Sequence, residues 1–163
     1  MAQNKQTVYH GTTAAAAANI RKEQRFRESE EDNEWLGSGV YFFGYKGLAQ
    51  SWTKGAGDVL TATLEYDDRE LLDLDDPNKR EALNRMMEGL NQRILNQIAI
   101  KPGDKFKDAK FWCFSCNMYR ELNPEIGVIS YTFPRRKPAG LSRFPNNARQ
   151  ICVSKHELIT SIA

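Results

Sequence analysis

The chain has 163 residues and a mass of 18.6 kDa, enough for one substantial core but too few for two ordinary domains, so we expect a single domain over residues 1–163. Its apolar content of 40% and charged content of 27% are typical of a soluble globular protein, and no apolar run approaches the ~20 residues of a transmembrane helix. The net charge of +2 is too small to indicate nucleic-acid binding by itself.

Cysteine and histidine usage restricts the chemistry further. Three cysteines cannot all pair within one chain, and the stretch MAQNKQTVYH has no apolar signal core, so we expect a cytoplasmic protein without a membrane partner. Cys113 and Cys116 form one lone C-x-x-C among aromatic residues, where a structural zinc site needs two further ligands. We predict buried structural cysteines there. With only His10 and His156 in the chain, we expect no metal site.

In the first half of the chain, the sequence predicts strands alternating with helices. β-Branched and aromatic residues favour a strand over 6–10, and an alanine-rich run behind two threonines favours a helix over 12–22. The polar, acidic stretch 23–36 shows no periodicity and predicts a loop. Three further elements follow: a strand at 37–43, a short helix at 46–54 and a strand at 58–66.

The second half begins with the clearest helix signal. Asp76 is a suitable N-cap, Pro77 suits the first turn, and apolar residues at helical spacing predict one helix over 75–98. The apolar positions are Leu83, Met86, Met87, Leu90, Ile94 and Ile98. The stretch 111–122 is ambiguous between helix and strand, and strands are predicted at 127–133, 148–154 and 157–163. This mixed, hairpin-compatible order indicates the α+β class.

Three separated stretches carry the functional signal: VYHGT at 8–12, LGSGVYFFGYKGLAQSW at 36–52 and ARQICVS at 148–154. Singly, His10 is compatible with a plain strand end, Tyr41 with a half-buried strand and Trp52 with the core. In this order and spacing, the sequence resembles the ADP-ribosyltransferases of the H-Y-E, diphtheria-toxin-like group, which includes the poly(ADP-ribose) polymerases. The resemblance spans nearly the whole chain. It implies two small, packed, mostly antiparallel sheets flanked by helices, with an NAD cleft between them.

The resemblance also implies a donor site for NAD. His10 would hydrogen-bond the ribose, and Gly11 would offer its backbone to the nicotinamide carboxamide, where the absence of a Cβ allows close approach. Thr12 would lie near the adenine-side ribose. Tyr41 and Trp52 would hold the cationic pyridinium between two aromatic faces. Ala49 stands where many relatives place a serine against the carboxamide.

The third stretch departs from the family pattern at Gln150, where relatives begin the strand with a catalytic glutamate. Cleavage of NAD passes through an oxocarbenium-like state that a carboxylate stabilises, and loss of such a partner typically costs about a hundredfold to a thousandfold in rate. Three explanations stay open: a natural H-Y-Q enzyme with slow or substrate-assisted chemistry, an NAD-binding pseudoenzyme, or an inactivated Glu-to-Gln variant. Glu157 lies seven positions beyond Gln150 and is a poor substitute.

The loop before the third stretch presents the acceptor in the family. Here it is basic, with Arg135, Arg136, Lys137, Arg143 and Arg149, while Phe133 and Phe144 are placed to stack on unpaired bases. The alternative is a solvated basic loop that steers the NAD pyrophosphate. The acidic stretch 28–34 falls where relatives carry a loop over the donor; alternatively, it discourages wrong acceptors or has no role.

These expectations favour a mono-ADP-ribosyltransferase that modifies nucleic acid or, as the second choice, protein. We expect this enzyme to be a bacterial or phage-defence toxin, and we also expect an inhibitory antitoxin-type partner. Poly-ADP-ribose synthesis is not expected, because elongation relies on the absent glutamate. The alternatives are a non-catalytic module that binds NAD, ADP-ribose or RNA on the same fold, and an NAD glycohydrolase.

Overall fold

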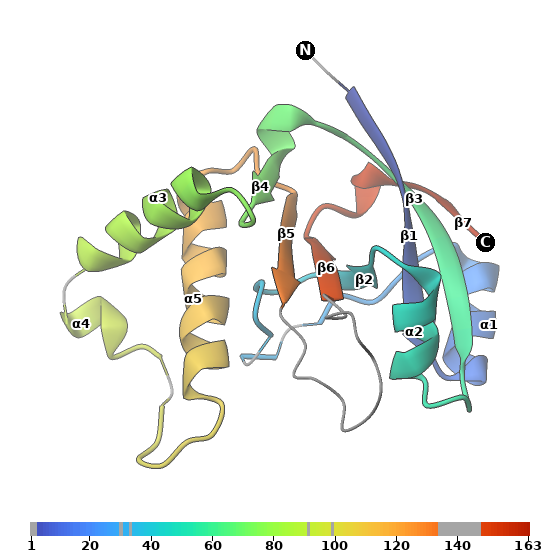
Figure 1. Cartoon of the computed structure of the whole chain (residues 1–163), viewed down its shortest axis with the longest axis horizontal. Helices are drawn as coiled ribbons and strands as arrows, with labels where there is room; N and C mark the ends of the chain where they lie inside the picture. The colour runs from blue at the N-terminus through green and yellow to red at the C-terminus, as the bar shows by residue number, and fades with distance from the viewer. Residues whose placement is uncertain (1–2, 30, 33, 91, 99, 134–147) are drawn as a thin grey trace, which may run out of the picture.

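A seven-stranded mixed sheet organises the protein (Figure 1). The computed structural model describes residues 3–29, 31–32, 34–90, 92–98, 100–133 and 148–163. The strand order is β4-β5-β6-β2-β1-β3-β7, and every pair is antiparallel except β4 with β5. The predicted α+β class is therefore confirmed. None of the helices in the described part of the chain is long and apolar enough to cross a membrane.

One half of the sheet contains β1 (Gln3–Thr12), β3 (Asp58–Asp67) and β7 (Ile159–Ile162). β1 and β3 pair along their whole length, from Gln3 opposite Asp67 to Thr12 opposite Asp58. The helices α1 (Ala14–Glu23) and α2 (Lys46–Trp52) lie beside this half (Figure 1). α1 begins where the sequence predicts a cap, since the Thr13 hydroxyl accepts a hydrogen bond from the amide of Ala16 at 3.2 Å.

The other half contains β4 (Leu71–Asp73), β5 (Val128–Phe133), β6 (Ala148–Val153) and β2 (Val40–Phe43). The helices α3 (Pro77–Glu88), α4 (Gln92–Leu95) and α5 (Lys107–Leu122) are grouped at the β4–β5 side (Figure 1). The expectation of two separate sheets is wrong, because β1 pairs with β2 and joins both halves into one sheet. That junction consists of one residue pair, Tyr9 opposite Phe43.

Two predictions along the helical segment are corrected. The single helix predicted over 75–98 starts as expected, with the Asp76 side chain accepting from the amide of Asn78 and Pro77 in the first turn. It is split, because α3 ends at Glu88 before Gly89 and the shorter α4 follows. The ambiguous stretch 111–122 belongs to α5, whose buried Ala109, Cys113 and Cys116 recur at the i, i+4, i+7 spacing of one helix face.

The two faces of β2, β5 and β6 pack into two different cores. Alternate residues of a strand point to opposite faces, and Phe42, Ile151 and Val153 join the core formed with β1, β3, β7 and α1. Ile129 and Cys152 point the other way, into the core beneath α3 and α5. Burial on both faces fixes the register of β2 and β6, which positions the intervening residues of these strands.

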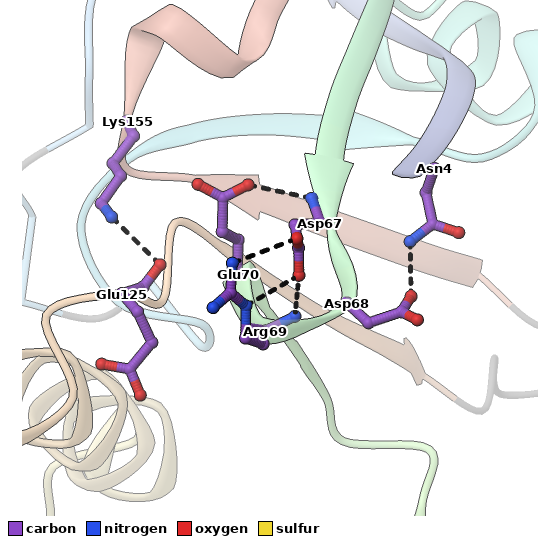
Figure 2. A network of polar contacts seen from close by, with 7 residues as sticks. All are labelled: Asn4, Asp67, Asp68, Arg69, Glu70, Glu125 and Lys155. Carbon is purple, nitrogen blue, oxygen red and sulfur yellow. Dashed lines mark hydrogen bonds and ion pairs between the residues drawn. The ribbon is translucent and has the colours of Figure 1, made fainter. Parts of the chain in front are cut away.

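A polar turn leads the chain from β3 to β4, where it crosses between the two halves. Figure 2 shows that Asp67 caps the 3-10 turn η1 (Asp68–Glu70), accepting from the amide of Arg69, while the Glu70 carboxylate accepts from the amide of Asp67, each at 2.9 Å. The Asn4 amide donates to Asp68 at 2.7 Å and ties this turn to β1. The reciprocal capping stabilises the crossing.

His156 links the segment that follows α1 to the C-terminal part of the chain. It lies in the 3-10 turn η2 (His156–Leu158), is half-buried, and its Nε2 accepts a hydrogen bond from the amide of Phe26 at 3.2 Å. Phe26 itself is buried and packs edge-on against His10 and Phe42. His156 therefore holds the segment that follows α1 against the core.

Candidate functional site

The candidate site lies where β1 and β2 separate. If their antiparallel pairing continued beyond Tyr9 and Phe43, Gly11 would lie opposite Tyr41. Instead a cavity of about 210 Å³ is present between these strands and the segment 27–39. Its lining combines all three stretches singled out from the sequence: His10, Gly11, Arg27, Ser29, Glu34, Gly39, Tyr41, Phe43, Trp52 and Gln150.

His10 bridges the two separating strands. Its Nδ1 lies 2.7 Å from the carbonyl oxygen of Tyr41, and because that oxygen only accepts, Nδ1 donates and Nε2 is left as an acceptor. Burial lowers the pKa of the imidazole, and the hydrogen bond to Tyr41 opposes this shift only in part. His10 is thus a neutral imidazole with an oriented acceptor nitrogen.

Tyr41 presents its ring to the cavity while its hydroxyl is held by the backbone. The hydroxyl donates to the carbonyl of Gly37 at 2.6 Å and accepts from the amide of Leu36 at 3.0 Å. Burial raises the pKa of this phenol far above its ordinary value, so it stays protonated at physiological pH. Gly37 accommodates the turn because its φ of 87° is left-handed. Tyr41 therefore offers an aromatic face, with no free hydroxyl.

Gly11 and Ala49 are packed against one another. A Cβ on Gly11 would collide with the carbonyl oxygen of Ala49, so glycine is required for α2 to approach β1. Ala49 is fully buried at this contact and does not line the cavity. Trp52, at the end of α2, is 68% exposed at the cavity rim, with its ring centroid 6.0 Å from that of Phe43. The packing of α2 thus places one aromatic ring at the entrance.

Two further cavities adjoin the first and share its residues. One, of about 310 Å³, shares His10 and Arg27 with it and extends along α1 to Arg25 and Phe26. The other, of about 330 Å³, shares Gly11 and Trp52 with it and is lined also by Thr12, Thr13, Thr53, Ala56 and Gly57. Thr12 lines both outer cavities. Together they form an extended cleft around the end of β1.

Gln150 lies on β6 opposite Phe43 of β2 and Tyr131 of β5. It lines the central cavity, and its side chain has no hydrogen-bond partner among the described residues. Arg149 points to the other face, where its Nη2 lies 3.4 Å from the Ser130 hydroxyl. The remaining predicted acceptor residues lie outside the described residues: Arg135, Arg136, Lys137, Arg143 and Phe144.

Arg27, Ser29 and Glu34 also line the cavity. The sequence pointed to the acidic stretch 28–34 as a whole but singled out none of these three residues. Ser29 forms an isolated bridge with Gly39, with N–O distances of 2.8 and 3.0 Å, and its hydroxyl donates to the Glu34 carboxylate at 2.9 Å. The bridge pairs Ser29 with Gly39, and Ser29, Glu34 and Gly39 all line the cavity. In the sequence, the local indication of such a contact was the pair of glycines, Gly37 and Gly39, on either side of Ser38.

α5 holds the far side of this loop. Arg120 donates to the carbonyls of Leu36 at 3.2 Å and of Ser38 at 2.5 Å, and Asn117 accepts from the amide of Ser38 at 2.9 Å. The Cys116 thiol faces the carbonyl of Trp35 at 3.8 Å. The predicted burial of Cys113 and Cys116 is confirmed, and burial raises the pKa of the Cys116 thiol to about 12. α5 therefore acts as a scaffold for residues 34–38.

A separate aromatic cavity of about 330 Å³ lies next to the site. Trp35 and Phe133 meet edge-on at 5.8 Å, and Tyr131 and Phe133 at 4.9 Å. This aromatic cavity is lined by Trp35, Leu36, Leu74, Arg80, Trp112, Tyr131 and Phe133. Trp35 follows Glu34 in the chain and Tyr131 pairs with Gln150, so the two cavities are neighbours across these residues.

The fold and the site define an α+β protein with a cleft at a split between two strands. No family model matches the chain, and no solved structure matches it significantly. A stretch of 52 residues, 32% of this chain, is 36% identical to the "Uncharacterized protein MJ0359" of Methanocaldococcus jannaschii, and covers 24% of that protein. The chain thus matches about a quarter of this relative's length, and the relative's name states no activity.

Proposed function

We propose that the protein is a mono-ADP-ribosyltransferase that uses NAD as the donor. The observation that carries the proposal is the convergence of His10, Tyr41 and Gln150, from three stretches far apart in the chain, on one cavity. These are the positions that the resemblance to H-Y-E enzymes assigns to the donor site.

The chemistry of the cleft suits a dinucleotide. The neutral His10 offers Nε2 as an acceptor for a ribose hydroxyl, and the rings of Tyr41 and Trp52 offer aromatic faces to a pyridinium cation. Arg27 lines both the central cavity and the one along α1, and it is exposed with no ion-pair partner among the described residues. A pyrophosphate spanning the two cavities would be paired by this guanidinium.

The proposed transfer breaks the bond between the ribose C1′ and the nicotinamide nitrogen. The bonding electron pair stays on that nitrogen and neutralises the pyridinium, while positive charge develops on C1′ and the ring oxygen of the ribose. An acceptor nucleophile then bonds to C1′ and loses its proton to solvent. Gln150 keeps an oxygen acceptor next to the reacting sugar but brings no charge.

The acceptor that we favour is an unpaired nucleobase. The aromatic cavity lined by Trp35, Trp112 and Tyr131 suits a flat ring, which stacks on aromatic side chains. It adjoins Gln150 through the β5–β6 register. A cytoplasmic toxin of phage-defence style, restrained by an antitoxin-type partner, is the biological setting that we favour for such an activity.

The donor site is tested by NAD titration with a matched pair of aromatic variants. Trp52 and Tyr45 are both 68% exposed, at the end and the start of α2, but only Trp52 lines the cavity. We expect Trp52→Ala to weaken NAD binding measured by calorimetry and Tyr45→Ala to leave it unchanged. Equal affinities in both variants would contradict the donor site.

The catalytic step is tested by nicotinamide release and label transfer. Radiolabelled NAD is incubated with single-stranded DNA, single-stranded RNA or cell lysate, and we expect label on nucleic acid. Nicotinamide release without any labelled macromolecule indicates an NAD glycohydrolase. Binding without release indicates a non-catalytic module, the alternative favoured by the uncharged Gln150.

A further inference from the structure

The central cavity contains a carboxylate at a position that the family pattern does not provide. Of its ten lining residues, all within the described part of the chain, Glu34 is the only acid, and it lines the cavity together with His10, Tyr41 and Gln150. A cavity built to stabilise a developing positive charge needs a negative group, and Gln150 is neutral. The acidic loop therefore contributes one side chain to the site itself.

Glu34 is fixed in place before any ligand binds. Its carboxylate accepts from the Ser29 hydroxyl at 2.9 Å, and its carbonyl accepts from the amide of Gly37 at 3.0 Å. Ser29 is in turn bound to Gly39 by two backbone hydrogen bonds. The side chain is half-buried, so its charge is less screened than that of a surface acid. Such an arrangement is the preorganisation that electrostatic catalysis requires.

The negative charge of Glu34 reaches the aromatic part of the cavity. Glu34 lines the same cavity as Tyr41, the residue expected to stack on nicotinamide. Other acids of this region are differently placed. Glu28 and Glu31 are exposed and do not line the cavity, and Glu23 lines only the neighbouring one along α1.

We infer that Glu34 supplies the carboxylate that Gln150 lacks. This inference rests on the proposed function and names the residue that makes it feasible without a glutamate on β6. In the ground state, the ionised Glu34 faces the pyridinium of NAD. As the bond from C1′ to nitrogen breaks and its electron pair moves to the nicotinamide, the positive charge moves to the ribose, and Glu34 stabilises it without forming a bond.

The test compares Glu34→Gln with Glu31→Gln, which removes an exposed acid from the same stretch. We expect Glu34→Gln to lower the rate of nicotinamide release by about a hundredfold to a thousandfold and Glu31→Gln to leave it unchanged. Ser29→Ala keeps the carboxylate but removes its hydrogen bond, so an intermediate rate is expected. Near-ultraviolet circular dichroism checks that each variant is folded.

A binding measurement separates this inference from the proposed function. NAD+ carries the pyridinium charge and NADH does not, so the wild type should bind NAD+ several-fold more tightly, and Glu34→Gln should lose this preference while still binding NADH. If Glu34→Gln keeps both the rate and the preference, the role of Glu34 is refuted and the proposed function stands. If the wild type binds neither dinucleotide, both are refuted. If it binds NAD without cleaving it, the transferase and the catalytic role of Glu34 are both refuted.

Discussion

Replacing Tyr41 with phenylalanine separates the two roles that the structure gives this residue. The ring faces the central cavity, whereas the hydroxyl donates to Gly37 and accepts from Leu36. Tyr41→Phe keeps the ring and removes both hydrogen bonds. Each such bond contributes about 0.5 to 1.5 kcal/mol net, so the free energy of unfolding should fall by about 1 to 3 kcal/mol.

Urea unfolding measures this loss directly. With an m-value of about 2 kcal/mol per molar, a 2 kcal/mol loss moves the midpoint by about 1 M, while m itself should not change. Tyr45→Phe is the matched control, because Tyr45 is 68% exposed and its hydroxyl has no hydrogen-bond partner among the described residues. An equal midpoint for both variants would refute the view that the Tyr41 hydroxyl anchors the loop.

The same variant links the loop to the proposed chemistry. Leu36 and Gly37 lie two and three residues after Glu34, so their release should loosen the carboxylate while the aromatic ring of residue 41 remains. We therefore expect Tyr41→Phe to bind NAD nearly as well as the wild type and to release nicotinamide more slowly. A variant that loses NAD affinity but keeps its turnover rate would show that the hydroxyl itself contacts the donor.

The remaining predictions concern thiols, packing and pH. Burial raises the pKa of Cys116 to about 12 and also raises that of Cys152. A thiol-specific disulfide reagent should therefore label the native protein slowly and the urea-unfolded protein fast. Rapid labelling of the native protein would contradict the burial of these thiols. Gly11→Ala should cost about 1 to 3 kcal/mol in urea unfolding, because its Cβ meets the Ala49 carbonyl, whereas Gly47→Ala, with open space around it, should not. Burial lowers the pKa of His10 below 6.5, so the unfolded chain binds more protons between the lowered value and 6.5. Stability should fall on acidification through that window and stay level above it, and His10→Gln should abolish this component; an unchanged pH profile would show that His10 is not buried as a neutral ring.

Elements whose signals are local could be predicted from the sequence. The start of α3 at Asp76 and Pro77 depends on capping within one turn, and β3 on its own alternation of apolar and polar residues, which are buried and half-buried in turn. The end of α3 could not be predicted from the sequence, because Leu90 and Ile94 continue the helical spacing of apolar residues past Gly89. β4 was missed because three residues, Leu71–Asp73, form a strand only through parallel pairing with β5.

The candidate site shows the same division between local and distant causes. His10, Tyr41 and Trp52 could be identified because each lies in a short stretch with a recognisable pattern, and the pairing of β2 with β6 then brings Gln150 to Phe43. Glu34 could not be identified individually from the sequence, because its position at the cavity depends on the bridge between Ser29 and Gly39, which no helical or strand periodicity predicts.

The position of Glu34 also bears on whether the proposed activity is compatible with the uncharged Gln150. A carboxylate acts on a developing cation through its distance and its exposure to solvent, and it need not come from a particular strand. The Ser29 hydroxyl holds the Glu34 carboxylate, while the Tyr41 hydroxyl and Arg120 of α5 hold the backbone of Leu36 two residues further on. A plain surface loop needs no such support. An acid held in this way, in a cavity that Gln150 also lines, fits the proposed transferase and would equally give a binding module a preference for NAD+ over NADH, so the rate of nicotinamide release by Glu34→Gln distinguishes the two.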